Sequence, residues 1–149
     1  IEKCKDPKSV TIFVRGGTEH VISEVERAVV DAKGAVTSAL EEGRYVIGGG
    51  AVEMELSKQL MAYATEIGGR EQLAIQAFAG ALESIPKALS ENAGMDAIDT
   101  LVALRNKHKD GNGKYFGINF VTGNVTNLKE EGILEPLKVK KQAIISATE

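Results

Sequence analysis

The chain has 149 residues, enough for one domain with a hydrophobic core, and its 43% hydrophobic and 26% charged residues are ordinary for a globular protein. The net charge of -3 argues against a general nucleic-acid binder, and the longest apolar runs are too short to span a membrane. Aromatic residues make up only 5% of the chain, so we expect an aliphatic core. The single cysteine, Cys4, excludes an internal disulfide and fits a reducing compartment.

The first third of the chain predicts a strand, a long helix and a second short strand. Residues 8–14 are rich in β-branched and aromatic side chains, which favour a strand. Thr18 is a suitable N-cap, and apolar residues recur at helical spacing over residues 19–42. Gly43 ends this helix, and the apolar residues 45–47 predict the second strand.

The rest of the chain predicts mostly helices. Pro86 lies inside a long helical pattern and predicts a kink or a break at Ile85. Four successive helical segments disfavour a Rossmann-type binder, which needs strands and helices in alternation. The predicted elements are helices at 51–66, 70–92 and 97–109 (the last capped by Asp96), a hairpin of 115–121 with 124–126, and a final helix that begins at Pro136. We therefore expect a mainly α fold with small β pieces.

The glycine triplet Gly48–Gly50 is the most informative feature of the chain. It closes the short strand 45–47 and leads directly into the helix that begins near Ala51. Such a junction presents backbone N–H groups at a helix N-terminus, where no side chain blocks an anion. A tight turn or close packing is the more frequent explanation of a glycine triplet, so the triplet alone is weak evidence for phosphate binding.

Asp31 is the first candidate for chemistry, because aspartate has a poor propensity for the middle of a helix. Its structural explanation is an i,i+4 ion pair with Arg27. Its functional explanation is a carboxylate that is presented to a reacting water. The 12 residues between Asp31 and Gly43 span about 18 Å of helix, so a hinge at Gly43 would move Asp31 through a large arc.

Asn119 and Glu135 are two further candidates. An amide at Asn119, in a short strand between turns, could bind a base edge, although stabilising a turn is its more common role. Glu135 precedes Pro136 and is either a helix-dipole partner or a carboxylate for a sugar hydroxyl. His20 and His108 are far apart in the sequence, so we do not expect metal binding by protein side chains alone.

Several short blocks, taken together and in order, resemble the C-terminal part of a group II chaperonin, the thermosome family. The resemblance covers essentially the whole chain, and it is more distant to the bacterial group I chaperonins. The blocks are Val14-Arg15-Gly16-Gly17-Thr18-Glu19, Glu41-Glu42-Gly43, Gly48-Gly49-Gly50, Gly69-Arg70-Glu71-Gln72-Leu73-Ala74, Glu91-Asn92-Ala93-Gly94, and Gly132-Ile133-Leu134-Glu135-Pro136 with Val139-Lys140.

The resemblance implies an ATP-driven machine of the cytoplasm that folds proteins inside two stacked rings. Residues 1–7 would be a remnant of the substrate-binding apical domain, residues 8–43 an intermediate-domain segment with a small α+β fold, and residues 44–149 a multihelical equatorial ATP-binding segment. The implied partners are other chaperonin subunits and, through the apical domain, unfolded proteins. Neither nucleic acid nor a membrane is implied.

The resemblance also assigns roles to single residues. Asp31 matches the aspartate that helps to activate the water attacking the γ-phosphate. Gly48, Gly49 and Gly50 match the glycine segment that contacts the nucleotide. Asn119 matches a position near the adenine, Glu135 matches the acidic residue that holds the ribose hydroxyls, and Gly43 matches the lower hinge.

Two parts of the family's ATP site are missing from this sequence. The main phosphate loop and the Gly-Asp-Gly-Thr-Thr segment, which serve the phosphates and Mg²⁺, belong to the other half of the family's chain. The chain thus reads as a portion of a longer protein, with ATP and Mg²⁺ held mainly by residues outside it, and by itself it should hydrolyse ATP poorly. The alternative is a non-catalytic structural or assembly fragment of the ring.

Overall fold

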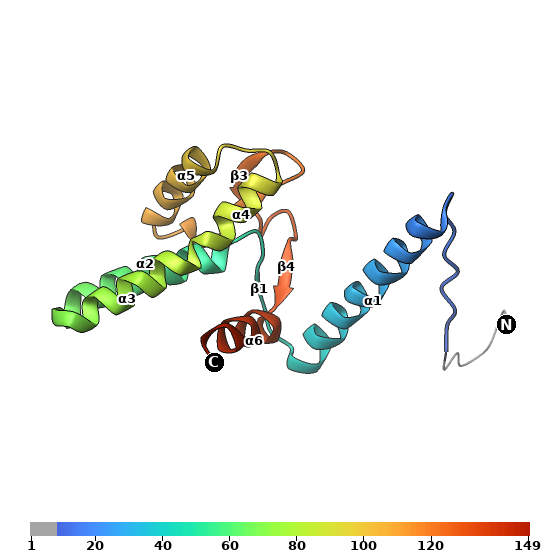
Figure 1. Cartoon of the computed structure of the whole chain (residues 1–149), viewed down its shortest axis with the longest axis horizontal. Coiled ribbons are helices and arrows are strands. Elements are labelled where there is room, and N and C mark those ends of the chain that lie inside the picture. The colour runs from blue at the N-terminus through green and yellow to red at the C-terminus, as the bar shows by residue number, and fades with distance from the viewer. Residues whose placement is uncertain (1–8) are drawn as a thin grey trace.

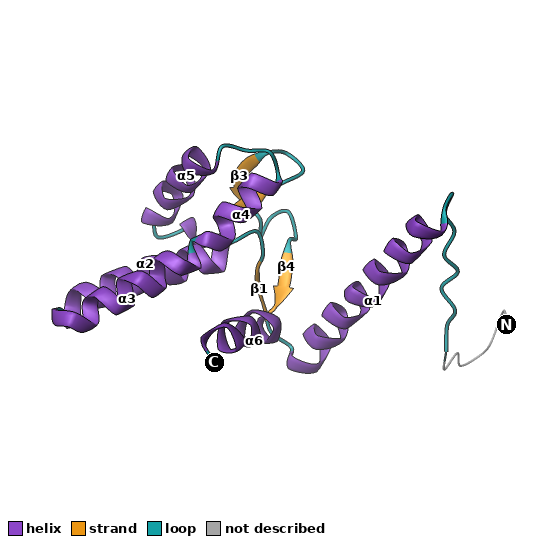
Figure 2. Ribbon diagram, in the orientation of Figure 1, coloured by secondary structure: helices purple, strands orange, loops and turns teal. Residues whose placement is uncertain are grey.

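The computed structural model describes residues 9–149, and helices dominate it (Figure 2). The expected class, a mainly α fold with small β pieces, is confirmed. The helices are α1 (Glu19–Glu42), α2 (Ala51–Ile67), α3 (Gly69–Leu82), α4 (Ser84–Asn92), α5 (Ala97–Lys109) and α6 (Leu137–Thr148), with a 3-10 helix η1 (Gly113–Tyr115). The strands are β1 (Tyr45–Ile47), β2 (Phe116–Asn119), β3 (Asn124–Asn127) and β4 (Leu134–Pro136).

The chain divides into an arm, residues 9–43, and a body, residues 44–149. Figure 1 shows α1 running away from the body, which it contacts at α6 and β4. As predicted, Thr18 caps α1, accepting a hydrogen bond from the Val21 N–H with its side-chain oxygen. Gly43 ends the helix with a φ of 65° and donates its N–H to the Ala39 carbonyl. The ends of α1 are therefore fixed by local caps.

The strand predicted for residues 8–14 is wrong over the described part of that range. Residues 9–14 form no regular structure, and Val10, Ile12 and Phe13 are all exposed. β-Branched and aromatic residues favour a strand only where a partner strand completes the ladder, and no strand within residues 9–149 pairs with residues 9–14. Cys4 and the apical remnant expected at residues 1–7 lie outside the described residues.

The helices of the body follow the predicted order with one shift. Helices α2 and α3 pack side by side and are joined by Gly68. The helix predicted for residues 70–92 is broken, as Pro86 indicated, but the break falls at Glu83. Pro86 then occupies the first turn of α4, where a missing N–H costs no helical hydrogen bond.

Two antiparallel strand pairs complete the body. Strand β2 pairs with β3, which confirms the predicted hairpin, and β1 pairs with β4 so that Val46 lies opposite Glu135. The sequence pattern does not predict the second pair, because Pro136 there indicates the start of a helix. Pro136 ends β4 and precedes the first residue of α6. The apolar core around Ile47, Ala51 and Leu128 lies where β1 passes into α2.

Candidate functional site

The glycine turn Gly48–Gly50 connects the two strand pairs of the body. Gly48 donates its N–H to the Ile133 carbonyl over 3.1 Å, just before β4. The Gly49 carbonyl accepts the Ile118 N–H of β2 over 2.8 Å. Gly50 precedes α2 with a φ of 77° and provides no side-chain cap for the helix N–H groups. Segments far apart in the sequence therefore meet at the start of α2.

Close packing explains why two of the three positions are glycine. A Cβ on Gly49 would lie 2.3 Å from Leu128 Cδ1 and 2.7 Å from the Ile118 carbonyl oxygen. A Cβ on Gly50 would lie 2.8 Å from Pro86 Cβ, and both glycines have positive φ angles. The packing explanation thus applies, yet the uncapped start of α2 also keeps the dipole and the donor groups that favour an anion.

The structure brings Glu135 to this turn. Glu135 is the middle residue of β4, and its Oε1 would lie 2.9 Å from a Cβ built on Gly48. Its other oxygen, Oε2, accepts a hydrogen bond from Lys140 Nζ over 2.9 Å. The Glu135 side chain is about one-third exposed, so it can still contact a ligand beside the turn.

Asn119 also lies near the turn, but its side chain is engaged. It follows Ile118, which bonds to Gly49, and it is buried. Its Oδ1 accepts the N–H groups of Val121 (2.8 Å) and Thr122 (3.1 Å), and its Nδ2 donates to Glu131. The turn-stabilising role weighed for Asn119 is therefore present, and contact with a base edge would require the amide to leave Glu131.

Asp31 is not gathered at the turn. It is exposed on α1, the helix that Figure 1 shows leading away from α2. The ion pair considered for it is not formed, because Arg27 pairs with Glu24 instead. The structure therefore leaves Asp31 without the structural explanation that the sequence offered.

An ion cluster built on the buried carboxylate of Glu53 lies beside the turn, and the sequence pattern does not predict it. Lys140 of α6 donates to Glu53 Oε1 over 2.7 Å as well as to Glu135. Burial lowers the pKa of Lys140, but the hydrogen bonds that it donates to Glu53 and Glu135 outweigh this effect and hold the pKa above its usual value. An acidic residue in the first turn of a helix usually pairs with the helix dipole. Nothing in its spacing indicated that Glu53 meets a lysine 87 residues away.

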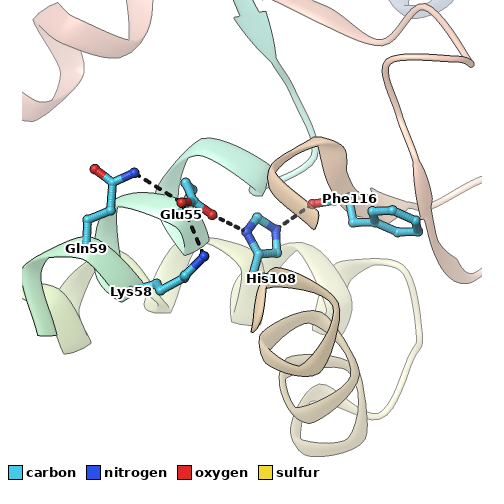
Figure 3. Close-up of polar contacts among 5 residues, drawn as sticks. All are labelled: Glu55, Lys58, Gln59, His108 and Phe116. Atoms are coloured by element: carbon cyan, nitrogen blue, oxygen red, sulfur yellow. Dashed lines mark hydrogen bonds and ion pairs between the residues drawn. The ribbon is translucent and has the colours of Figure 1, made fainter. Parts of the chain in front are cut away.

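A second buried cluster fastens α5 to α2 and to β2 (Figure 3). His108 is fully buried, with Nδ1 2.9 Å from Glu55 Oε2 and Nε2 2.9 Å from the Phe116 carbonyl oxygen. Burial raises the pKa of Glu55, but hydrogen bonds from His108 and Gln59 and the charge of Lys58 bring it below its ordinary value. Both ring nitrogens of His108 face oxygen atoms, so the buried ring bridges Glu55 of α2 and the Phe116 carbonyl of β2.

The described residues also form a cavity, which the predicted site residues do not line, and they contain neither a metal-binding cluster nor a membrane-spanning helix. A cavity of about 450 Å³ runs along β1, α2, η1 and Lys129, and none of the predicted site residues lines it. Across residues 9–149 no group of three or more acidic, histidine or cysteine side chains is arranged to hold a metal ion. Over the same residues, no helix has the length and apolar character needed to cross a membrane.

The body is mainly helical, and its fold has a counterpart among solved chaperonin structures. A structure described as the open state monomer of a group II chaperonin from Methanococcoides burtonii matches with a TM-score of 0.74 and 50% identity, covering 89% of this chain and 33% of that one. A thermosome subunit of Methanothermococcus thermolithotrophicus is 58% identical, and thermosome subunit alpha of Archaeoglobus fulgidus is 56% identical. Each alignment covers 100% of this chain and 27% of the relative.

The model of the TCP-1/cpn60 chaperonin family matches residues 1–149, and the chain belongs to that family. The resemblance drawn from the ordered blocks is thereby confirmed at the level of the family. The chain spans only about a quarter of the length of the curated relatives that it matches.

Proposed function

We propose that this chain is part of an ATP-dependent group II chaperonin subunit. Residues 8–43 would be its intermediate-domain segment and residues 44–149 its equatorial, nucleotide-binding segment. The subunit would assemble with others into a double ring and fold proteins in the enclosed chamber. ATP would be its cofactor, together with Mg²⁺ that is held mainly by residues outside the chain.

One observation carries the proposal. The fold gathers three separate parts of the sequence, Gly48–Gly50, Asn119 and Glu135, around the start of α2 in a chain of the chaperonin family. An uncapped helix start fits a phosphate, and a partly exposed carboxylate fits a pair of ribose hydroxyls. The helix start would supply the phosphate side of a nucleotide site, and the carboxylate would supply its ribose side.

The arm supplies the moving part of the proposed mechanism. Bound ATP brings the phosphoanhydride bond that is hydrolysed. Rotation about Gly43 would swing α1 as a rigid rod and carry Asp31 toward the γ-phosphate, where its carboxylate would accept a proton from the attacking water. Gly43 suits a pivot, because it has a φ of 65° and, its two chain neighbours aside, no atom of residues 9–149 lies within 4 Å of where its Cβ would be. Helix α1 buries none of its residues, so the movement disrupts little packing.

The proposal is tested by the Glu135→Gln substitution in the full-length, assembled protein. Loss of one charge-assisted hydrogen bond to a ribose hydroxyl should weaken ATP binding about tenfold, as measured by calorimetry. The matched control is Glu130→Gln, a nearby exposed residue that hydrogen-bonds Asn127. If the wild-type protein shows no measurable affinity for ATP, the proposed function is wrong.

The second candidate, a structural piece of the ring with no part in catalysis, is favoured by Asn119, whose amide accepts two hydrogen bonds and donates one inside the body. Limited proteolysis of the full-length, assembled protein with and without ATP separates the two. Protection by ATP of the linkages around residues 48–50 and 119–122 supports nucleotide binding, and identical cleavage supports the structural role.

A further inference from the structure

Lys140 is the only described residue that joins the start of α2 to β4 through side-chain ion pairs. Its ammonium lies 2.7 Å from Glu53 Oε1 and 2.9 Å from Glu135 Oε2, so one cation holds carboxylates from two elements. The Lys140 side chain is only 16% exposed, which makes these the interactions that compensate its burial. The Lys140 ion pairs therefore join α2 to β4, and they are not a pair of surface contacts.

Glu53 has no other described partner that could hold it. Its side chain is 3% exposed, and its second oxygen, Oε2, is buried with no hydrogen bond among the described residues. A buried carboxylate with one compensating cation cannot easily change position without it. Because Glu53 belongs to the first turn of α2, it anchors the Lys140 ammonium at a fixed place relative to the glycine turn.

Glu135 differs from Glu53 in the use of its oxygens. Lys140 takes Oε2, while Oε1 lies over Gly48, where even a methyl group would collide with it. Fixing one oxygen leaves the carboxylate little freedom to rotate, and so sets the direction of the other. The side chain of Glu135 is also the most exposed of the three, at 35%.

We propose that Lys140, anchored by Glu53, is a positioning residue that orients the Glu135 carboxylate for the ribose hydroxyls of the bound nucleotide. This inference rests on the proposed function, since it needs Glu135 to contact ribose. It adds that recognition of the sugar depends on a lysine and a glutamate that do not touch the nucleotide themselves.

The test is sugar selectivity in the full-length, assembled protein, measured as the ratio of the Kd for 2′-deoxy-ATP or 3′-deoxy-ATP to the Kd for ATP. We expect a ratio of about tenfold for at least one analogue in the wild type and a ratio near one in Lys140→Met, because a misdirected carboxylate loses its charge-assisted hydrogen bond. A lysine that only stabilised the fold would weaken ATP and its analogues equally and leave the ratio unchanged. Lys141→Met, at the adjacent exposed lysine, is the matched control and should keep the ratio.

Lys140→Met leaves Glu53 as a buried, unpaired carboxylate and could prevent folding, so the double variant Glu53→Met with Lys140→Met is tested beside it. Replacing a whole buried ion pair by apolar side chains of similar volume often restores stability. The double variant should fold, assemble and still lack sugar selectivity. A folded double variant with wild-type selectivity would overturn the positioning role.

Glu135→Gln distinguishes the failure of this inference from that of the proposed function. If Glu135→Gln abolishes selectivity while both Lys140 variants retain it, Glu135 binds ribose without help and only the positioning role fails. Two results would contradict ribose binding by Glu135: a wild type that does not discriminate between the sugars, or a Glu135→Gln variant with unchanged discrimination. Either result would also contradict the positioning role of Lys140.

Discussion

Helix α1 of the arm has 24 residues and buries none of them, whereas α2 of the body has 17 residues and buries Ala51, Glu53, Met54, Ser57 and Ala64. The arm's helix is fixed at its ends by Thr18 and Gly43, and its exposed ion pair between Arg27 and Glu24 adds little stability. The start of α2 is fixed instead by contacts with β2, β4 and α4. Local signals thus suffice for the exposed helix of the arm, while the start of α2, where the candidate site lies, depends on partners from distant parts of the chain.

We expect the largest difference between arm and body from the Asp31→Ala substitution in the full-length protein. If the arm carries the catalytic carboxylate and the body binds the nucleotide, ATP hydrolysis should fall by about 10²–10⁴-fold while the Kd for ATP stays unchanged. Steady-state turnover and equilibrium binding measure the two effects separately. Glu26→Ala, an exposed acid on the same helix, is the control and should retain turnover. Normal turnover by Asp31→Ala would leave the arm without a catalytic role.

Alanine substitution at Gly49 and at Gly43 should also separate the body from the arm. Both residues have positive φ angles, of 60° and 65°, but a Cβ at Gly49 would overlap Leu128 and Ile118, while a Cβ at Gly43 meets nothing within 4 Å. We expect Gly49→Ala to destabilise the body by about 3 kcal/mol and Gly43→Ala to cost about 1 kcal/mol.

Hydrogen exchange of the β2 amides in the full-length protein measures this difference. The Ile118 N–H, which bonds to Gly49, should exchange more than a hundredfold faster in Gly49→Ala, because about 1.4 kcal/mol corresponds to a factor of ten. The same amide should be unaffected by Gly43→Ala. Equal effects of the two substitutions would mean that the turn is not held by packing.

The accuracy of prediction from the sequence also differs between the arm and the body. Thr18 and Gly43 carry their own conformational signals, so the limits of α1 could be predicted to the residue. The predicted strand 8–14 is absent over residues 9–14, because none of the strands in the described part of the chain pairs with this segment. The β1–β4 pair was missed for the opposite reason, since three residues on each side form strands only through each other.

The residues of the candidate site could likewise be predicted only in part from the sequence. The glycine triplet and the ordered family blocks led to Gly48–Gly50, Asn119 and Glu135, and the fold places these residues around one turn. The side chains that hold them were not predicted, because their partners are distant in sequence. Glu131 holds Asn119 across 12 positions, and Lys140 reaches Glu53 across 87. No local pattern encodes such pairs.

The smallest effect that distinguishes body from arm is a response to acid. The pKa of Glu55 is lowered in the folded state, so its contribution to stability is present above its ordinary value of 4.5 and is lost as the pH falls below it. We expect the amides of α5 and β2, which the His108 cluster fastens, to lose protection below pH 4.5 by an amount worth about one hydrogen bond, near 1 kcal/mol.

Glu55→Gln should remove this acid-dependent loss, because the amide does not titrate in this range and its oxygen can still accept a hydrogen bond from His108. Exchange rates of variant and wild type are compared at each pH, so that the intrinsic dependence of exchange on pH cancels. Glu24→Gln is the control in the arm, since its exposed pair with Arg27 contacts neither α5 nor β2. An acid response that survives Glu55→Gln would show that a different group in the body controls it.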